Sequence, residues 1–369
     1  MQQLTRGWNA LEDVAGAVSA LGIRRPLIVT GRHFADRVSG LLSGAPVFGG
    51  YHANPDWADA AAGEALYREH ACDGLVSVGG GSAIDTAKAI KARLLAADEE
   101  NALATRWQTR RLPHLAIPAT AGTGAEATQF AVMYVGGRKH SLSHIDLLPD
   151  GVLLDPALLT SLPDYHKKSC ALDALCQGIE SYWAKASSPA SRPDAVQAVV
   201  GVLKALPAYL QGDEDAADAM LWAAYCSGCA IQRTRTTAAH AMSYQITAML
   251  GMAHGHACAL TLPYLWAHLM RDKHQAEALQ PLAEAMGLPE AAMVPDFLLG
   301  LLLALGMESI AAPTAQQLDL LAATVNADRL GNHPESLTPA EIRDIYAQAL
   351  RPVPDEKRAG CEALFYECR

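Results

Sequence analysis

Short apolar runs alternate with helical stretches over the first 150 or so residues, and this alternation limits the fold more than any other feature of the chain. The runs at 26–30, 73–78 and 114–117 are rich in Leu, Ile and Val, and a fourth lies at 130–135. Runs of this kind, separated by helices of roughly 10–15 residues, predict βαβ units around a buried parallel sheet. Ligands of such sheets bind beyond the carboxyl ends of the strands, where the helices begin.

From about residue 162 onward the chain changes to long Ala- and Leu-rich segments with helical spacing, interrupted by Gly and Pro. This pattern predicts an all-helical second half. The expected boundary lies between 155–156 and 162–163, giving an α/β dinucleotide-binding domain (1–160) and an all-α domain (161–369). The predicted helices of the second domain are 170–184, 193–210, 215–231, 236–250, 257–270, 275–286, 289–305, 314–326 and 338–350.

Composition excludes several classes of protein. Half of the 369 residues are hydrophobic and 18% are charged, which suits a large buried core and argues against long disorder. The net charge is −10 and no basic tract occurs, so we expect no nucleic-acid partner. No apolar stretch reaches the roughly 20 residues of a membrane span, and the first residues lack the apolar core of a signal peptide. We therefore expect a cytoplasmic protein whose eight cysteines are mainly buried thiols.

A glycine-rich turn at 78–88 follows one predicted strand and begins a helix. Gly79, Gly80 and Gly81 allow backbone amides to approach a ligand without interference from a Cβ atom. We expect Ser82 to cap the helix and Asp85 to complete a capping box. The positive end of that helix suits a pyrophosphate, so these residues are candidates for cofactor binding.

A second turn, 117–126, also leaves a predicted strand and is rich in small and hydroxyl-bearing residues, including Thr120 and Thr123. That composition suits close contact with a polar cofactor. The alternative is a tight turn between strand and helix, with no role in binding.

Candidate metal ligands lie in the helical half. Asp173 and Gln177 are four residues apart and project from one face of a predicted helix. His240 lies in a helix, and His254 lies 14 residues later in an expected turn at 252–256. Two imidazoles, a carboxylate and an amide oxygen can build a divalent-metal site, although both histidines can also be structural. His256 can support a ligand, contact the substrate or belong to the turn.

Five of these segments, 79–88, 118–126, 155–156, 173–180 and 240–255, occur in the order typical of the iron-containing (group III) alcohol dehydrogenases. The chain resembles that family over most of its length, least beyond about residue 300. The resemblance implies a dehydroquinate synthase-like architecture, with a Rossmann-like domain and a helical domain that holds a divalent metal. In the family the metal polarises the alcohol or aldehyde oxygen while hydride passes between substrate and nicotinamide.

Two positions depart from the family pattern. The usual ligands are one Asp and three His, but Gln177 stands where the second ligand is normally His. An amide oxygen is a neutral, harder donor than imidazole, so Fe²⁺ is the expected metal, with Zn²⁺ or Mn²⁺ as alternatives. Tyr244 stands where many members carry a further His near the nicotinamide. It can donate a hydrogen bond to the substrate oxygen or serve only as a packed aromatic.

Within the family, the segments 173–183 and 236–256 are similar to the phosphonoacetaldehyde reductase branch. Arg235 precedes His240 by five residues, where ordinary members tend to have apolar side chains. A guanidinium binds phosphonate or carboxylate in a bidentate manner, so Arg235 is a candidate anion anchor, with Arg233 as a second one. The alternative is a surface arginine paired with an acidic neighbour.

The preferred nucleotide is predicted from the end of the first strand. NAD-preferring members often place an Asp where Gly31 stands, and a carboxylate there repels a 2′-phosphate. Arg32 can pair with that phosphate, so we expect NADP(H) to be preferred over NAD(H). In the alternative, Arg32 is simply solvated.

Taken together, the residues and the resemblance predict metal-assisted, NAD(P)H-dependent reduction of a small anionic aldehyde, such as phosphonoacetaldehyde to 2-hydroxyethylphosphonate. The candidate catalytic residues are Tyr244, Arg235 and His256. The alternatives are a dehydrogenase of a neutral short-chain alcohol or diol, and a degenerate nucleotide-binding relative in which Gln177 abolishes metal binding. Because relatives are commonly dimers or larger, we expect a homodimer or a higher homo-oligomer.

Overall fold

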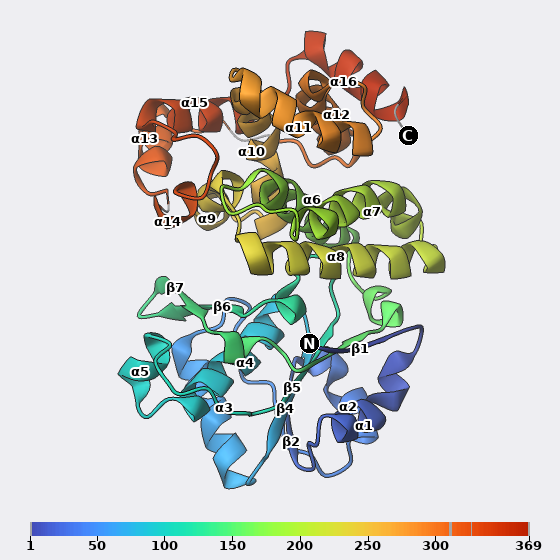
Figure 1. Cartoon of the computed structure of the whole chain (residues 1–369), viewed down its shortest axis with the longest axis vertical. Helices are drawn as coiled ribbons and strands as arrows, with labels where there is room; N and C mark the ends of the chain where they lie inside the picture. Colours follow the sequence, from blue (N-terminus) through green and yellow to red (C-terminus); the bar gives the residue numbers. More distant parts are fainter. Residues whose placement is uncertain (1, 310–311, 326, 368–369) are drawn as a thin grey trace. The chain divides into compact units, whose positions relative to one another are not determined.

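The computed structural model describes residues 2–309, 312–325 and 327–367. Contacts divide the chain into two compact units (Figure 1). The N-terminal unit contains Met1–Leu162 and Gly212–Gly228, and the C-terminal unit contains Pro163–Gln211 and Cys229–Arg369. The division into domains at 160/161 remains a prediction.

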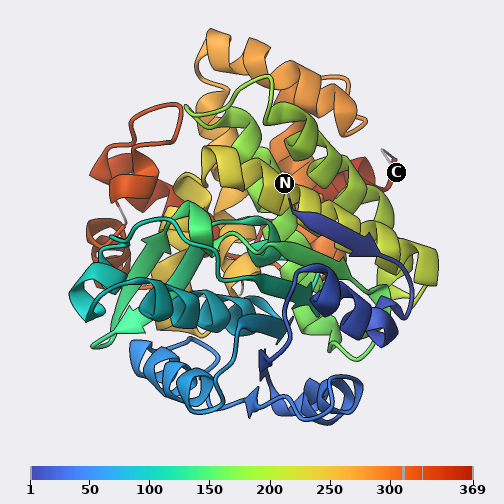
Figure 2. The ribbon, with the colours of Figure 1, turned by 60° about the horizontal axis from the view of Figure 1, so that its bottom comes forward.

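A six-stranded parallel sheet forms the centre of the N-terminal unit, in the order β1-β8-β5-β4-β2-β3. The strands are β1 (Gln3–Arg6), β2 (Pro26–Thr30), β3 (Val47–Phe48), β4 (Gly74–Gly79), β5 (His114–Pro118) and β8 (Gly151–Leu154). The runs predicted at 26–30, 73–78 and 114–117 are its central strands, every residue of which is buried. Figure 2 shows β1 (dark blue) alongside β8 (green) at one edge.

Helices cover both faces of this sheet. Leu27 and Val29 of β2 share a core with α3 (Trp57–Glu69) and α4 (Gly81–Leu95). Ile28 points to the opposite face and shares a second core with α1 (Val14–Ala20) and α2 (Arg32–Leu41) (Figure 1). Because side chains alternate along a strand, apolar residues at every position require cover on both sides. The predicted Rossmann-like α/β fold of this half is confirmed.

The strand predicted at 130–135 exists, but its expected place in the parallel sheet is wrong. It forms β6 (Phe130–Val135), which pairs antiparallel with β7 (Arg138–Ser143) in a separate two-stranded sheet. The reason is the Gly136-Gly137 turn, whose φ angles are 55° and 75°. Two consecutive residues with positive φ favour a tight hairpin, and glycine adopts this conformation without steric cost.

The C-terminal unit is helical over its described residues, as predicted. Its main helices are α6 (Asp164–Trp183), α7 (Arg192–Leu210), α9 (Ala238–Leu250), α10 (His254–Leu269), α11 (Lys273–Ala285), α12 (Val294–Ala304), α13 (Ala315–Ala323), α15 (Pro339–Ala349) and α16 (Asp355–Glu367). A further helix, α8 (Glu214–Thr234), begins in the N-terminal unit and ends in the C-terminal unit. None of the described helices is long and apolar enough to cross a membrane.

The start of α10 differs from the sequence expectation. The turn expected at 252–256 ends earlier, and His254 is already the first residue of the helix. This helix packs very closely against α6, because a Cβ atom added at Gly255 would lie 2.0 Å from the carbonyl oxygen of Ser169 and 2.7 Å from Cβ of Asp173. Only glycine allows this approach, which brings the first turn of α10 next to Asp173.

Candidate metal centre

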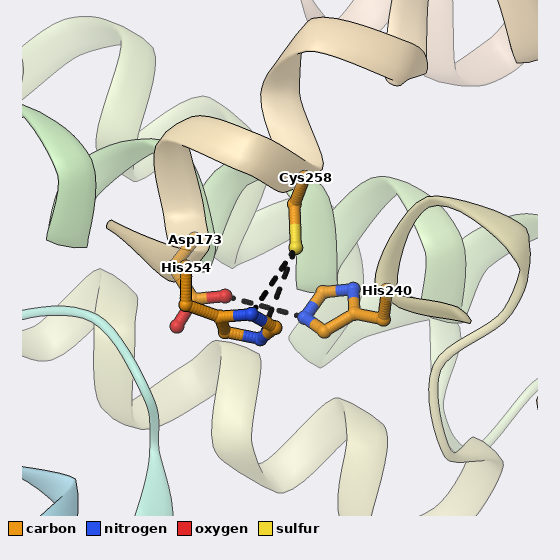
Figure 3. Close-up of side chains that lie close together, drawn as sticks. All are labelled: Asp173, His240, His254 and Cys258. Atoms are coloured by element: carbon orange, nitrogen blue, oxygen red, sulfur yellow. Dashed lines mark hydrogen bonds and ion pairs between the residues drawn. The ribbon is translucent and has the colours of Figure 1, made fainter. Parts of the chain in front are cut away.

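Four buried or half-buried side chains converge in the C-terminal unit (Figure 3). Asp173 comes from α6, His240 from α9, and His254 and Cys258 from α10. Their ligating atoms all lie within 4.8 Å of one another. The structure thus brings together three of the four predicted metal ligands and adds a thiol that the sequence analysis treated as an ordinary buried cysteine.

The fourth predicted ligand, Gln177, is buried one turn after Asp173 on α6. Its side-chain amide is neutral and binds a metal only through its oxygen, unlike the negatively charged carboxylate of Asp173. Its role as a metal ligand stays a prediction.

A carboxylate on α6 orients the first imidazole. Glu180 follows Asp173 by two helical turns and accepts a short hydrogen bond at Oε2 from Nδ1 of His240. This bond requires the proton on Nδ1 and leaves Nε2, 3.2 Å from Oδ1 of Asp173, to face the cluster. Glu180 is therefore a positioning residue that was missed in the sequence analysis, although its i, i+7 spacing from Asp173 pointed to a shared helix face.

The carboxylate of Glu180 is itself held firmly. Its Oε1 accepts hydrogen bonds from the amides of Thr237 (3.2 Å) and Ala239 (2.8 Å) and from the Thr237 hydroxyl (2.7 Å). These groups form the amino end of α9, where the helix dipole favours a negative charge. Burial opposes ionisation, but the charge of His240 and these hydrogen bonds lower the pKa of Glu180 below its usual value.

The second imidazole is oriented by a hydroxyl. Ser243 Oγ donates its single proton to the carbonyl oxygen of His240 at 2.8 Å, so it accepts from Nδ1 of His254 at 3.2 Å. That pattern leaves Nε2 of His254 without a proton, and Sγ of Cys258 lies 3.8 Å from Nε2 and 4.0 Å from Nδ1 of this ring. The orienting hydrogen bonds therefore use Nδ1 of both imidazoles and leave Nε2 for a metal, as is common for metal-bound histidines whose other nitrogen donates a hydrogen bond.

The charges in the cluster suit a cation. Burial lowers the pKa of His240, but Cys258, Glu180 and Asp173 outweigh this effect and raise it well above its usual value. Burial likewise opposes ionisation of Cys258, yet His240 and His254 lower the pKa of its thiol to about 7. The anionic groups thus attract a proton to His240, and a divalent cation would replace that proton. Carboxylate, imidazole and thiol donors fit a transition metal such as Fe²⁺ or Zn²⁺.

An aromatic ring and a guanidinium extend the cluster. The ring of Tyr244 stacks on that of His254, with 5.7 Å between centroids and 9° between planes. The guanidinium of Arg329 lies 5.9 Å from the Tyr244 centroid, and its Nη1 donates to Oγ1 of Thr236. Burial raises the pKa of the Tyr244 phenol, which keeps its proton at neutral pH. The sequence offered no signal for Arg329, which lies where the family resemblance is least.

The two arginines predicted to bind an anionic group, Arg233 and Arg235, are exposed. Arg235 is exposed and follows the end of α8 in a left-handed conformation (φ 61°), with its amide bonded to the carbonyl of Ile231. Its role as an anion anchor stays a prediction. Arg233 pairs with Asp194 at 3.1 Å on the surface, which agrees with the alternative stated for such arginines.

His256 does not belong to the group of ligating atoms. Its Nε2 donates to the carbonyl oxygen of Met307 at 2.7 Å, and its Nδ1 accepts from the hydroxyl of Tyr165 at 3.2 Å. Burial lowers its pKa, so the ring is neutral at pH 7. These contacts tie the first turn of α10 to its surroundings and support a structural role, while a catalytic role remains only a prediction.

The two predicted nucleotide turns lie next to each other in the N-terminal unit. A Cβ atom at Gly80 would lie 3.3 Å from Cγ2 of Thr120, and one at Gly81 would lie 3.1 Å from Cγ2 of Thr123. Pairing of Gly79 with Pro118 aligns the carboxyl ends of β4 and β5, so both turns leave the same edge of the sheet. This edge is where a parallel sheet binds a nucleotide.

The capping box predicted for Ser82 and Asp85 is wrong. The helix begins at Gly81 with Gly80 as its N-cap, so neither residue has the required position. The hydroxyl of Ser82 donates to the carbonyl of Ala53, and the carboxylate of Asp85 accepts the amide of Val132 at 3.0 Å. Burial raises the pKa of Asp85 to about 6. Cofactor contacts by these two side chains remain predictions.

The residues expected to select the nucleotide lie at the end of β2. Gly31 is the N-cap of α2, and Arg32 is its exposed first residue. A Cβ atom at Gly31 would lie 3.5 Å from the hydroxyl of Tyr51, an ordinary contact. A side chain therefore fits at this position, and the preference for NADP(H) is open to test.

Comparison with known families agrees with this geometry. The sequence-family model for iron-containing alcohol dehydrogenases matches residues 2–156. The model for the C-terminal part of the Fe-containing alcohol dehydrogenase family matches residues 168–350. The chain belongs to the iron-containing alcohol dehydrogenase family.

Individual relatives differ in name and coverage. The probable alcohol dehydrogenase EutG of Escherichia coli is 38% identical over 56% of this chain and 53% of its own length. Phosphonoacetaldehyde reductase of Streptomyces viridochromogenes is 36% identical over 67% of this chain and 65% of its own. The chain thus spans about half to two thirds of these relatives. The structure of sulfoacetaldehyde reductase from Bifidobacterium kashiwanohense with NAD⁺ is similar with a TM-score of 0.89 and 27% identity, covering 95% of this chain and 98% of the other.

Proposed function

We propose that this chain reduces a small aldehyde that carries an anionic group, using NAD(P)H and a divalent metal. The main support is the convergence of Asp173, His240 and His254, in which Nδ1 of each imidazole is engaged in a hydrogen bond. A bound metal would polarise the aldehyde C=O bond, so that the carbonyl carbon accepts hydride from the nicotinamide and the oxygen becomes an alkoxide. Membership of the iron-containing alcohol dehydrogenase family supports this reaction.

The chain's own residues prepare the site for this reaction. Glu180 and Ser243 fix the two rings, so little reorganisation accompanies metal binding. Tyr244 is protonated and stacked on His254, which makes it a candidate donor to the developing alkoxide.

Two arginines are candidates for binding the anionic group. Arg329 bonds Thr236, which is the residue next to Arg235, and its guanidinium lies over the ring of Tyr244. Two relatives are named as reductases of phosphonoacetaldehyde and sulfoacetaldehyde, both two-carbon aldehydes with an anionic end. EutG is named an alcohol dehydrogenase, so a neutral substrate is the second candidate.

We keep NADP(H), because of Gly31 and Arg32, as the proposed nucleotide.

The test compares NADPH oxidation with phosphonoacetaldehyde, sulfoacetaldehyde and propanal, on Fe²⁺-loaded and chelator-treated protein. We expect turnover of an anionic aldehyde that is lost on chelation. Arg235→Ala and Arg329→Ala should each raise KM for the anionic aldehyde by about 10-fold or more and leave that for propanal nearly unchanged. Arg233→Ala is the matched control. Turnover that survives chelation, or equal effects on both aldehydes, would overturn the metal or the anion part of the proposal.

A further inference from the structure

We propose that the Sγ atom of Cys258 is a metal ligand, which makes the site one carboxylate, two imidazoles and one thiolate. That a metal binds here rests on the proposed function. That the thiol is one of its ligands rests on the position of Cys258.

The position of Cys258 is that of a ligand. It follows His254 by four residues on α10, so both side chains project from one face of the helix. Its Sγ lies 3.8 Å from Nε2 of His254, within the group that includes Asp173 and His240 (Figure 3). The side chain is fully buried, yet it points at polar donors. On metal binding the thiol would release its proton to solvent and donate a lone pair of sulfur to the ion.

The thiol supplies a second anionic donor beside Asp173. Gln177 occupies the place on α6 where relatives carry a third histidine, and Cys258 supplies an anionic donor from a different helix. With Asp173 and Cys258 both negative, a divalent ion in the site has no net charge. A site with three histidines and one carboxylate would instead carry one positive charge. Thiolate donors favour Zn²⁺, Fe²⁺ and Co²⁺ over Mn²⁺. A thiolate ligand therefore makes Mn²⁺ a less suitable metal than the amide oxygen of Gln177 alone would indicate.

The test uses Co²⁺ as a spectroscopic probe. The full-length protein is stripped with a chelator, titrated with Co²⁺, and followed by absorbance and by metal analysis. We expect a near-ultraviolet sulfur-to-cobalt charge-transfer band that saturates at one ion per chain. Cys258→Ser should abolish the band and weaken Co²⁺ binding by about 10-fold or more.

Matched variants separate the possible outcomes. Cys176→Ser removes an equally buried thiol that lies outside the ligand group, and it should keep the band. Gln177→Ala should also keep the band. Stoichiometric binding without a band would overturn the thiolate ligand while leaving the proposed function intact, and a band that persists in a folded Cys258→Ser variant would do the same. Absence of Co²⁺ binding combined with aldehyde reduction after chelation would instead remove the metal from the proposed function.

Discussion

Glu180 would act on a bound metal through His240, so its replacement separates orientation from ligation. The substitution Glu180→Gln removes the negative charge that faces Nδ1 of His240 and the amino end of α9. We expect metal affinity to fall by about 10- to 100-fold, measured by competition with a chromophoric chelator. Glu341→Gln, which changes a half-buried helix-capping carboxylate outside the ligand group, is the control and should leave affinity unchanged. Unaltered affinity in Glu180→Gln would contradict the role of this hydrogen bond.

A buried carboxyl in the N-terminal unit predicts a pH dependence of stability. Burial raises the pKa of Glu126 to about 7, and its Oε1 has no hydrogen-bond partner among the described residues. At this group the folded state therefore binds a proton more tightly than the unfolded state. Its contribution to the stability of the folded protein is lost as the pH rises from about 4.5 to 7. We expect the difference in unfolding free energy between Glu126→Gln and wild type to favour the variant more at pH 8 than at pH 5, by on the order of 2 kcal/mol. Urea unfolding at both pH values tests this, and an equal difference at the two would refute it.

At the scale of elements, the metal centre depends on the contact between α6 and α10. In Gly255→Ala the new methyl group would collide with the backbone of Ser169 and with Asp173, so α10 must move away. We expect a loss of about 1–3 kcal/mol or more in unfolding free energy together with loss of metal binding. Gly360→Ala, in α16 with nothing near the added methyl group, should be neutral or slightly stabilising. Normal metal binding by a folded Gly255→Ala protein would show that the close approach is not required.

For the whole molecule, we expect each ligand to protect the elements that carry its site. A ligand that binds the folded state raises the free energy of local opening where it makes contacts. In hydrogen exchange, metal should therefore slow exchange in α6, α9 and α10. NADPH should slow it in the turns after β2, β4 and β5. Protection by NADPH that avoids these turns would contradict the assigned nucleotide edge.

The parts of the fold that depend on local periodicity were predictable. Apolar runs identified β2, β4 and β5, and helical spacing identified most helices of the second half, although no predicted range covers α16 or residues 327–330. Errors arose where one or two residues decide the outcome. A helix start two positions earlier than expected removed the capping box of Ser82, and the Gly136-Gly137 turn joined β6 to β7 in a hairpin.

The sequence alone determined the α/β and helical halves and the two glycine turns, because these depend on residue types and spacing along short stretches of chain. Asp173, His240 and His254 were candidate ligands by residue type and by the order of the family's segments, although they lie in three different helices. Only the tertiary structure decided that Cys258, Glu180 and Arg329 belong to the same neighbourhood. These side chains come from different helices, and their mutual distances depend on how closely α6, α10 and the short helix α14 (Ala327–Leu330) pack against their neighbours. Close packing is a property of surfaces that meet in space, and no spacing along the chain encodes it directly.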